Sequence, residues 1–450
     1  MERKIMGKKV ALHNLGCKVN AYEMEAMHQM LVQHGYEIVP FAPGADVYII
    51  NTCTVTNIAD RKSRQMLHKA KKMNPDSIVI AAGCYVETAG EKVEEDLSID
   101  LIIGNNKKKE LVSILENFQK DKNRRYTLPD INHTKEYEEL QIGHTAEHTR
   151  AYIKVQDGCN QFCTYCIIPY TRGRVRSRRM AEVMKEVERL AQAGYREVVL
   201  TGIHLSSYGV DLEEADCNLL TLISQVHQAA GIQRIRLGSL EPGIITEEFV
   251  RSLSQMHKVC PHFHLSLQSG SNGVLTRMKR RYTAEEFEQK CSIIRRFYQQ
   301  PALTTDIIVG FPGETKAEFE ETKAFVQRIN FYETHIFKYS QRTGTRAADM
   351  PGQIPESEKG ARSNVLIELG KKNKRKFMES FRGQEVEILA EERNIIGSVP
   401  YWTGHTKEYL KVLVQTDDDI RNQLHTLTAA EVFENDALIL TGKHAGKWPN

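Results

Sequence analysis

The chain has 450 residues, which at about 150 residues per domain predicts about three domains. Hydrophobic residues at 41%, charged residues at 26% and a net charge of +3 are typical of a globular protein and exclude a disordered, collagen-like or membrane-embedded chain. No segment approaches the roughly 18 uncharged apolar residues of a membrane-spanning helix, and the basic residues 1–9 lead into no signal-peptide core, so we expect a cytoplasmic protein without membrane contact.

Strand-like and helical segments alternate over residues 8–120. Apolar runs typical of strands cover residues 10–15, 46–51, 77–82 and 101–104, and helical patterns cover residues 22–34, 58–73 and 107–117. This alternation favours a parallel sheet with helices on its faces. Cys17, Cys53 and Cys84 each follow one of the first three strands. Because such sheets gather ligands at the carboxyl ends of their strands, we expect the three thiols at one edge.

The rest of the chain predicts two more domains after a polar linker, residues 121–148. Between residues 149 and 378, helical patterns separate six strand-like runs, at residues 152–156, 197–201, 234–237, 263–267, 304–309 and 334–337. Six β/α units predict a partial barrel, short of the eight of a closed one. Residues 380–445 carry short strands with turn-rich connections, which favours a small antiparallel barrel, a common nucleic-acid-binding scaffold. The fold class is therefore α/β with a small C-terminal β-domain.

Basic residues gather in two places. Residues 171–179 carry five arginines and no acid, and residues 359–377 carry seven Lys or Arg against one acid, Glu368. Such clusters favour phosphate binding. A charge run can equally be the solvated face of a helix, and this alternative stays open for the second cluster.

The most specific motif is Cys159-x3-Cys163-x2-Cys166, within GCNQFCTYCIIPYTRGR. Three thiolates on one tight loop can hold three corners of a cubic 4Fe–4S cluster, whereas electron-transfer clusters use four. The missing ligand leaves one iron open to a substrate. A zinc site, the alternative, usually needs paired CxxC motifs and a fourth protein ligand, and neither is nearby. The other cysteines, at positions 217, 260 and 291, share no context and are expected to be buried or incidental thiols.

The cysteine loop resembles the radical S-adenosylmethionine (SAM) signature, with Tyr165 in the aromatic position before the third cysteine. The resemblance implies that SAM binds the open iron and is cleaved by one electron to a 5′-deoxyadenosyl radical. LGCKVNAYE, NTCTVTN and AAGCY, around Cys17, Cys53 and Cys84, are similar to the N-terminal domain of the methylthiotransferase family. That resemblance implies a second 4Fe–4S cluster, which carries the sulfur to be inserted. Each cysteine alone could be a buried thiol, but three after successive strands favour a ligand set.

The resemblance covers essentially the whole chain and implies a methylthiotransferase domain (8–120), a radical SAM domain (149–378) and a TRAM-like RNA-binding domain (380–445). LTGIHLSSYG, LGSLEP, HLSLQSGS and TTDIIVGFPGET resemble strand ends that line the SAM pocket, and FKYSQRTGTRA resembles the last barrel motif. Family members commonly have serine where Gly238 stands and proline where Ser266 stands. The residues thus expected to bind SAM are Tyr165, Gly202, Ser239, Glu241, Ser266, Gln268, Asp306 and Gly310.

The family divides by target into isopentenyladenosine in tRNA, N6-threonylcarbamoyladenosine in tRNA, and an aspartate of a ribosomal protein. GCKVNAYE and NTCTVTNIADRKSRQ are closest to the threonylcarbamoyladenosine class, since the others typically read CQMN or CPKN at the first cysteine. The implied reaction replaces C2–H of that adenosine, on the 3′ side of the anticodon, by a methylthio group and uses two SAM. Lys18 or Arg61 could pair with the threonyl carboxylate, although a solvent-facing charge is the default interpretation.

The expected partners are a tRNA anticodon stem-loop and an electron donor such as flavodoxin or ferredoxin. Arg172, Arg174, Arg176 and Arg178 directly follow the cysteine loop and are expected to bind RNA phosphates, or else the SAM carboxylate or acidic neighbours. In the last domain, aromatic residues could stack on bases or pack in the core: Tyr401, Trp402 and Tyr409. The alternatives are a methylthiotransferase with another target, or a non-catalytic iron–sulfur RNA-binding protein, which the open cluster disfavours.

Overall fold

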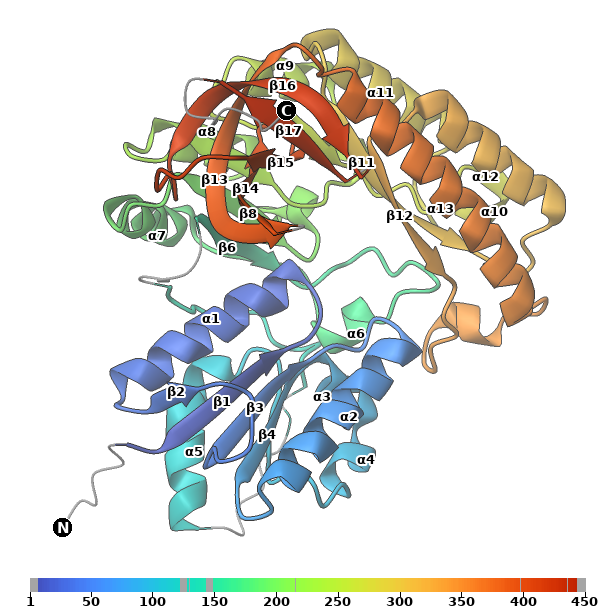
Figure 1. Cartoon of the computed structure of the whole chain (residues 1–450). Helices are drawn as coiled ribbons and strands as arrows, with labels where there is room; N and C mark the ends of the chain where they lie inside the picture. The colour runs from blue at the N-terminus through green and yellow to red at the C-terminus, as the bar shows by residue number, and fades with distance from the viewer. Residues whose placement is uncertain are drawn as a thin grey trace.

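Three units follow one another along the chain: a parallel α/β sheet, a partial β/α barrel and a small closed barrel (Figure 1). The structure is a computed structural model and describes residues 7–121, 128, 130–142, 149–214, 216–396, 398–434 and 436–442. Of the expected linker, residues 122–127, 129 and 143–148 lie outside this description. Within the described residues, no helix has both the length and the apolar character needed to span a bilayer.

The N-terminal unit is a five-stranded parallel sheet with the strand order β2-β1-β3-β4-β5. Its strands are β1 (Lys9–Asn14), β2 (Glu37–Val39), β3 (Val47–Thr52), β4 (Ile78–Gly83) and β5 (Leu101–Ile103). Its helices are α1 (Lys18–Gln33), α2 (Asn57–Met73), α3 (Cys84–Ala89), α4 (Glu91–Glu94) and α5 (Leu111–Lys120). Every residue of β3 is buried, as expected for a central parallel strand covered on both faces. The sequence predicted all of these strands except β2, which has only three residues.

The central unit has the six expected strands of a partial barrel: β6 (Arg150–Asp157), β8 (Glu197–Gly202), β9 (Arg234–Leu237), β10 (His262–His264), β11 (Ala302–Val309) and β12 (Glu333–Lys338). They form two parallel ladders, joined by parallel bridges between Ile235 and Val259 and between Leu240 and Leu265. A two-residue strand that was not expected, β7 (Arg176–Ser177), pairs antiparallel with β6. The helices are α6 (Ile168–Thr171), α7 (Met180–Gln192), α8 (Leu219–Gln228), α9 (Glu247–Ser254), α10 (Asn272–Arg277), α11 (Ala284–Phe297) and α12 (Lys316–Ile329).

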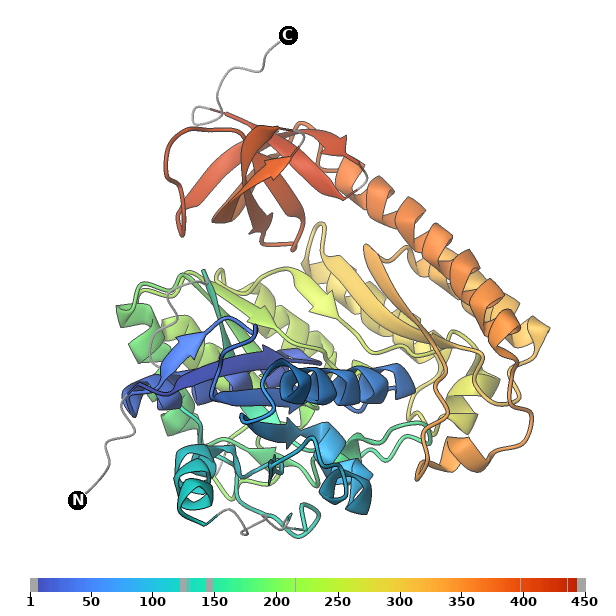
Figure 2. The same cartoon turned by 60° about the horizontal axis from the view of Figure 1, so that its bottom comes forward.

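The C-terminal unit is a closed barrel with the order β13-β14-β15-β17-β16. Its strands are β13 (Glu385–Ile396), β14 (Val399–Thr406), β15 (Lys411–Val414), β16 (Leu424–Phe433) and β17 (Ala437–Thr441). The expected antiparallel barrel needs one correction, because β15 and β17 pair in parallel. The long helix α13 (Glu356–Glu379) runs along the partial barrel and leads into the closed one (Figure 2).

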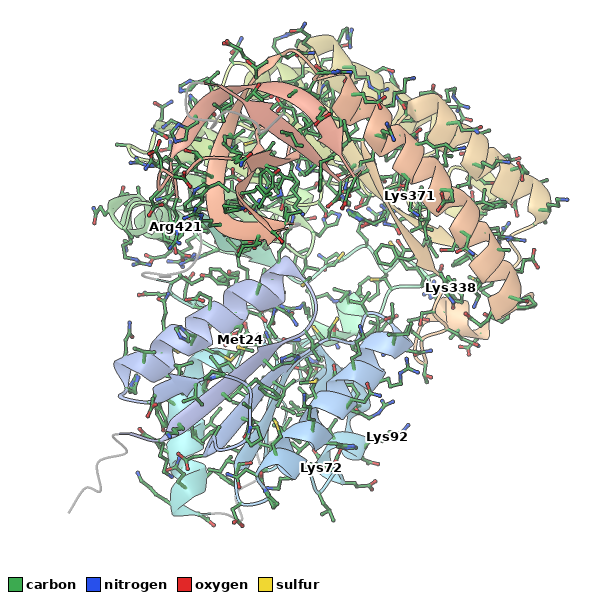
Figure 3. All side chains as sticks on the ribbon, viewed as in Figure 1. Met24, Lys72, Lys92, Lys338, Lys371 and Arg421 are labelled. Carbon is green, nitrogen blue, oxygen red and sulfur yellow. The ribbon has the colours of Figure 1, made fainter. Side chains whose placement is uncertain are left out.

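The second basic cluster, residues 359–377, lies on α13 and is largely neutralised by the protein itself. Lys359, Arg362 and Lys374 each pair with glutamate or aspartate side chains. Lys371, on the outer surface of α13 (Figure 3), pairs with Glu368 one turn away. The structure therefore favours the alternative of a solvated helix with internal ion pairs over a phosphate-binding surface.

A buried ion-pair network fixes the N-terminal unit to the partial barrel. Glu23 of α1 is fully buried, and its carboxylate accepts hydrogen bonds from Lys154 of β6 at 2.9 Å and from Arg172 at 2.8 and 3.1 Å. Lys108 lies 3.1 Å from the same carboxylate. Burial opposes the ionisation of Glu23, but these three cations outweigh it and hold its pKa well below the usual value. Removing one member of such a network leaves buried charge without compensation.

Glu23→Gln tests whether this network holds the two units together. The variant keeps the shape of the side chain but removes the charge that three buried cations share, so we expect the free energy of unfolding to fall by about 3 kcal/mol. The measurement is chemical denaturation of the metal-free protein under reducing conditions. Glu25→Gln, at a partly exposed position of the same helix, serves as the control and should change stability by less than about 0.5 kcal/mol. Equal losses in both variants would contradict the assignment.

Candidate functional site

Cys17, Cys53 and Cys84 meet at the carboxyl edge of the N-terminal sheet. Cys17 is the N-cap of α1, Cys53 follows β3, and Cys84 begins α3 directly after β4. Gly16, at a φ of +109°, allows the close approach, since a Cβ there would lie 3.2 Å from Cys53 Sγ. The pKa of Cys53 is raised to about 11, mainly by burial and further by the thiols of Cys84 and Cys17. The three sulfurs thus face one another at the expected place.

The second triad lies on the loop between β6 and α6. Gly158 permits this loop, because a Cβ there would lie 1.8 Å from a backbone carbonyl oxygen. Burial raises the pKa of Cys159 to about 11 and that of Cys166 to about 12, and Cys163 adds to both effects. Arg280 donates a hydrogen bond from Nη1 to Cys163 Sγ at 3.2 Å. The three cysteines of the motif are therefore mutual neighbours with one cation beside them.

The spacing of the thiols distinguishes a cluster from a single ion. Within the described part of the chain, one group of three ligand atoms lies within 4.8 Å of one another, and it is His264, Asp306 and His335, not a cysteine triad. A Zn–S bond of about 2.3 Å would bring sulfurs to within about 4 Å of one another. A 4Fe–4S cluster places each cysteine on a different iron and spreads the sulfurs more widely. Both donor sets therefore fit an iron–sulfur cluster better than zinc.

One buried arginine accompanies each triad. Burial raises the pKa of Cys17 and of Cys53, and the charge of Arg172 acts in the opposite direction. Arg280 does the same for Cys159 and Cys166. A 4Fe–4S cluster held by three thiolates has a net negative charge, which a neighbouring guanidinium group stabilises. The positive charge at both sites is the second feature that fits such clusters.

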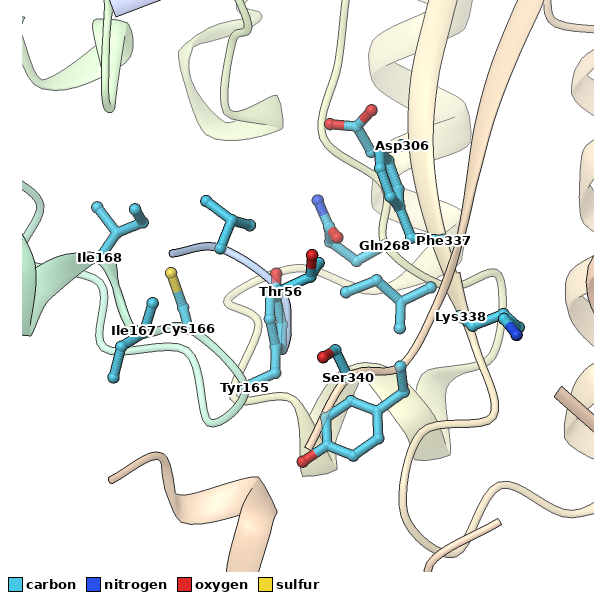
Figure 4. Close-up of a pocket in the computed structure, with 13 residues that line it drawn as sticks. Thr56, Tyr165, Cys166, Ile167, Ile168, Gln268, Asp306, Phe337, Lys338 and Ser340 are labelled. Carbon is cyan, nitrogen blue, oxygen red and sulfur yellow. The ribbon is translucent and has the colours of Figure 1, made fainter. Parts of the chain in front are cut away.

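A cavity of about 290 Å³ connects the surroundings of the two triads (Figure 4). Its wall includes Cys166 and Tyr165 from the cysteine loop, and Val55 and Thr56 from the segment that follows Cys53. Residues of β11 and β12 close the opposite side. A molecule in this cavity would therefore contact the cysteine loop and the segment that follows Cys53.

Four of the residues expected to bind SAM lie in or near this cavity. Tyr165, Gln268 and Asp306 line it. Gly310 has a φ of +71°, and a Cβ there would lie 2.3 Å from Lys359 Cγ, so this position requires glycine. Their contact with SAM remains a prediction.

The other residues expected to bind SAM lie at or after the ends of β8, β9 and β10 and do not line this cavity. Glu241 accepts hydrogen bonds from Arg280 at 2.8 Å on both carboxylate oxygens, and its position places it beside the cysteine loop. Ser266 contributes its backbone carbonyl, which accepts from Arg280 at 3.3 Å. Ser239 is exposed. A Cβ on Gly202 would lie 2.8 Å from a glutamine side chain, which explains glycine there.

The arginines after the cysteine loop require a correction. Arg172, Arg176 and Arg178 are buried, with at most 1% of each exposed, so they are unavailable to RNA phosphates. Arg172 and Arg178 pair with buried glutamates, and Arg176 donates to backbone carbonyls. The alternative of acidic and internal partners is therefore the correct one for these three. Arg174 is exposed, and its guanidinium lies 4.4 Å from the centroid of the Phe162 ring.

Lys18 and Arg61 occupy different surroundings. Although solvent reaches Lys18, its pKa is lowered, first by partial burial and then by Arg236 and Arg150, while Asp306 acts in the opposite direction. The Lys18 ammonium thus faces the inside of the partial barrel. Arg61 is exposed on α2. Neither side chain has an ion-pair or hydrogen-bond partner among the described residues.

Two histidines that sequence reasoning missed lie beside Asp306. His264, Asp306 and His335 come from β10, β11 and β12, and the register places Asp306 directly opposite His335. His264 Nε2 is 3.2 Å from Asp306 Oδ2, and the two imidazole rings stack at 5.7 Å. Because Asp306 lines the cavity, this polar group adjoins it. His264 begins the motif HLSLQSGS, which gave it no role of its own, and His335 lies in none of the motifs, so only the strand register brings the two together.

The aromatic residues of the last domain are engaged inside the protein. Tyr401 and Trp402 are buried in the closed barrel. Tyr409 is held at the contact with the partial barrel, with Arg236 at 4.5 Å and Arg150 at 5.0 Å from its ring centroid. The packing alternative is therefore favoured for all three.

Comparisons with known proteins agree with this architecture. Residues 9–104 match a model described as "Uncharacterized protein family UPF0004", and residues 153–326 match the radical SAM superfamily. Among solved structures, the radical SAM methyltransferase TsrM from Kitasatospora setae, with cobalamin and a [4Fe-4S] cluster bound, gives a TM-score of 0.56 at 15% identity and covers 74% of this chain and 75% of its own. At that identity the likeness concerns the fold alone.

Curated relatives match most of the chain. Threonylcarbamoyladenosine tRNA methylthiotransferase MtaB of Bacillus subtilis is 40% identical over 91% of both chains, and that of Aquifex aeolicus is 41% identical over 86% of this chain and 93% of its own. tRNA-2-methylthio-N(6)-dimethylallyladenosine synthase of Moorella thermoacetica is 39% identical over 84% and 85%. This similarity over nearly the full length, together with the cysteine geometry, shows that the chain belongs to the radical SAM tRNA methylthiotransferase family.

Proposed function

We propose that this enzyme inserts a methylthio group at C2 of N6-threonylcarbamoyladenosine, on the 3′ side of a tRNA anticodon. Relatives named for two different targets match it at 40% and 39% identity, so identity alone does not select the substrate. The observation that carries the proposal is the polar group formed by Lys18, His264, Asp306 and His335.

The chemistry of adenine explains why this group matters. C2 and N6 lie on either side of N1, so a substituent on N6 shares an edge of the base with the carbon that receives sulfur. The residues that hold the substituent must then lie close to the site of sulfur transfer. Lys18 directly follows Cys17, and the carboxylate of Asp306, which lines the cavity, raises the pKa of its ammonium group. The same edge of the base can therefore face both the first cysteine triad and this polar group.

The polarity of the group suits a threonylcarbamoyl substituent. Lys18 offers a cation to its carboxylate, and the imidazole and carboxylate side chains offer partners to its hydroxyl and N–H groups. An isopentenyl substituent would offer no polar partner to this group, in which His264 and Asp306 are partly buried, and this disfavours it. An aspartate side chain of a protein would lack the purine that fills the cavity. The ribosomal-protein alternative and the isopentenyl alternative are thus both less well supported.

The cofactors follow from the two donor sets. When bound, two 4Fe–4S clusters and two SAM molecules would supply the sulfur, the methyl group and the radical of this reaction. Cys17, Cys53 and Cys84 would hold one cluster, and Cys159, Cys163 and Cys166 the other. Arg172 and Arg280 would offset the negative charge of these sites. We also propose a small external redox protein, such as flavodoxin or ferredoxin, as electron donor, and the cytoplasm as the location.

Cysteine variants test the two-cluster assignment. After anaerobic reconstitution, Cys84→Ala and Cys166→Ala should each bind about half of the iron of the wild type, because each removes a ligand of one cluster only. Both should lose methylthiolation of tRNA. Cys84→Ala should still form 5′-deoxyadenosine, and Cys166→Ala should not. The buried Cys260, which lies in neither triad, provides the control Cys260→Ala with full iron. A wild type that forms no 5′-deoxyadenosine would instead support the non-catalytic alternative.

Substitutions in the polar group test the target. Lys18→Met and His335→Leu should each lower kcat/KM for RNA that carries threonylcarbamoyladenosine by about tenfold or more, because a charged or polar partner of the substituent is lost. Activity on RNA with isopentenyladenosine should stay equal or rise. Iron content, measured in parallel, must match that of the wild type. Equal losses on both RNAs would show that these residues do not select the substituent.

The exposed side of α2 is the best-supported RNA-binding surface. The helix begins directly after Val55 and Thr56, which line the cavity. Along it, exposed cations continue away from this point to its last turn, where Lys72 lies (Figure 3): Arg61, Lys62, Lys69 and Lys72. None of the four has an acidic partner within the described residues. We therefore propose that phosphates of the anticodon stem-loop follow α2, which gives Arg61 a phosphate-binding role rather than a threonyl-binding one.

Neutralising these cations should weaken RNA binding without regard to sequence. Arg61→Gln and Lys62→Gln should each reduce the slope of log affinity against log salt by about one. The measurement is tRNA binding by fluorescence anisotropy across a salt series. Lys371→Gln on α13, where the lysine is paired with Glu368, is the matched control and should leave the slope unchanged. A flat salt profile in the wild type would count against phosphate contacts altogether.

A further inference from the structure

The loop that carries Cys159, Cys163 and Cys166 also borders a second hollow, distinct from the cavity that Figure 4 shows. The second hollow has a volume of about 340 Å³, with Gln161 of the loop and Glu241, Arg281 and Lys290 in its wall. This hollow and the cavity share no lining residue. The cysteine loop can therefore be approached from the protein surface without entry into the space where RNA and SAM would bind.

Four cationic residues lie in segments that adjoin the cysteine loop, and we refer to them as the collar: Arg174, Lys279, Arg281 and Arg346. All four are exposed. Within the part of the chain that the structure describes, none of them has an acidic partner within ion-pair distance. Acidic side chains nearby are mostly engaged elsewhere: Glu241 pairs with Arg280, and Glu286 caps α11. Even with the exposed Asp349 counted, this surface has an excess of positive charge.

The collar residues are fixed close to the cysteine loop. Arg174 lies over the ring of Phe162, which precedes Cys163. Lys279 and Arg281 flank Arg280, whose guanidinium contacts Cys163 Sγ at 3.2 Å. Ala347, which follows Arg346, donates its backbone N–H to the carbonyl of Thr164 in the cysteine loop at 2.9 Å. Three separate segments thus place cations around the same few residues.

We propose that the collar is the docking surface for an acidic redox protein that delivers single electrons. This inference rests on the proposed function, because cleavage of SAM consumes one electron that must come from outside. The reduced flavin or iron–sulfur centre of the donor would give up one electron, and the cluster that Cys159, Cys163 and Cys166 would hold would relay it to SAM. Transfer of that electron to SAM breaks the bond between sulfur and C5′, which yields methionine and a 5′-deoxyadenosyl radical.

Two observations favour a protein donor over RNA at this surface. Arg281 of the collar lines the second hollow, whereas α2, with its cations, begins at the cavity. In addition, Arg174 covers Phe162, so this ring is not free to stack on a base. Electron-transfer complexes bury little surface and depend on complementary charge for encounter and orientation. A ring of exposed cations around one loop suits such a short-lived complex.

The double variant Lys279→Glu/Arg281→Glu tests this proposal. Biolayer interferometry with purified flavodoxin should show at least about tenfold weaker binding and a flatter salt dependence, because two attractive charges become repulsive. Formation of 5′-deoxyadenosine driven by reduced flavodoxin should fall by a similar factor. With dithionite, a small reductant that needs no docking, the same variant should match the wild type to within about twofold, and its tRNA affinity should be unchanged.

Arg61→Glu/Lys62→Glu on α2 is the matched control and should show the reverse pattern, with weaker tRNA binding and normal flavodoxin binding. A collar variant that loses tRNA affinity but binds flavodoxin normally would overturn the proposal and assign the surface to RNA. If the double variant also loses dithionite-driven activity, a second variant on a separate segment, Arg346→Glu, tests the collar. Unchanged flavodoxin binding by Arg346→Glu would also overturn the proposal. Absence of 5′-deoxyadenosine from the wild type with dithionite would refute the proposed function, while flavodoxin binding would still report on the collar.

Discussion

A single buried guanidinium group, that of Arg172, fixes the two halves of the active site relative to each other. It donates to Glu23 and Asn20 of α1 and to Asp157 at the end of β6. Asn20 in turn donates to the carbonyls of Leu15 and Thr52, which directly precede the segments of Cys17 and Cys53. Because Arg172 also follows the second cysteine loop closely in sequence, one side chain links both cysteine triads. Their relative position then depends on buried ion pairs.

This arrangement serves the chemistry as well as the fold. The ion pairs around Glu23 and Asp157 include four buried cations, Lys108, Lys154, Arg172 and Arg176. Burial raises the pKa of two further carboxyl groups nearby, the buried Glu138 and the partly buried Glu87, the latter to about 7, so they offset this charge incompletely. Positive charge therefore remains next to the first triad, where an anionic cluster would use it.

Much of the fold followed from the sequence because its signals are local. Apolar strands followed by helices predicted the parallel sheet and the six-stranded partial barrel, and the cysteines appear at the expected strand ends. The pairing of β15 with β17 and the short β2 depend on contacts distant in sequence, and no local pattern reveals them. The same applies to the site. A run of arginines looked like an RNA-binding surface, yet Arg172 and Arg178 are buried because acids from distant segments pair with them.

The group of His264, Asp306 and His335 shows the same limit more clearly. Each residue lies on a different strand, and only the register of β10, β11 and β12 brings the three together. Sequence motifs identified the reaction class, but the polarity of the space around N6 of the substrate required the three-dimensional arrangement.

The central claim is that the target is the threonylcarbamoyl form of adenosine in tRNA. Nucleoside mass spectrometry of tRNA from a strain lacking this gene tests it directly. The account predicts that 2-methylthio-N6-threonylcarbamoyladenosine disappears, that its precursor without the methylthio group accumulates, and that the gene restores the product. Loss of 2-methylthio-N6-isopentenyladenosine instead, with the threonylcarbamoyl product intact, would contradict it.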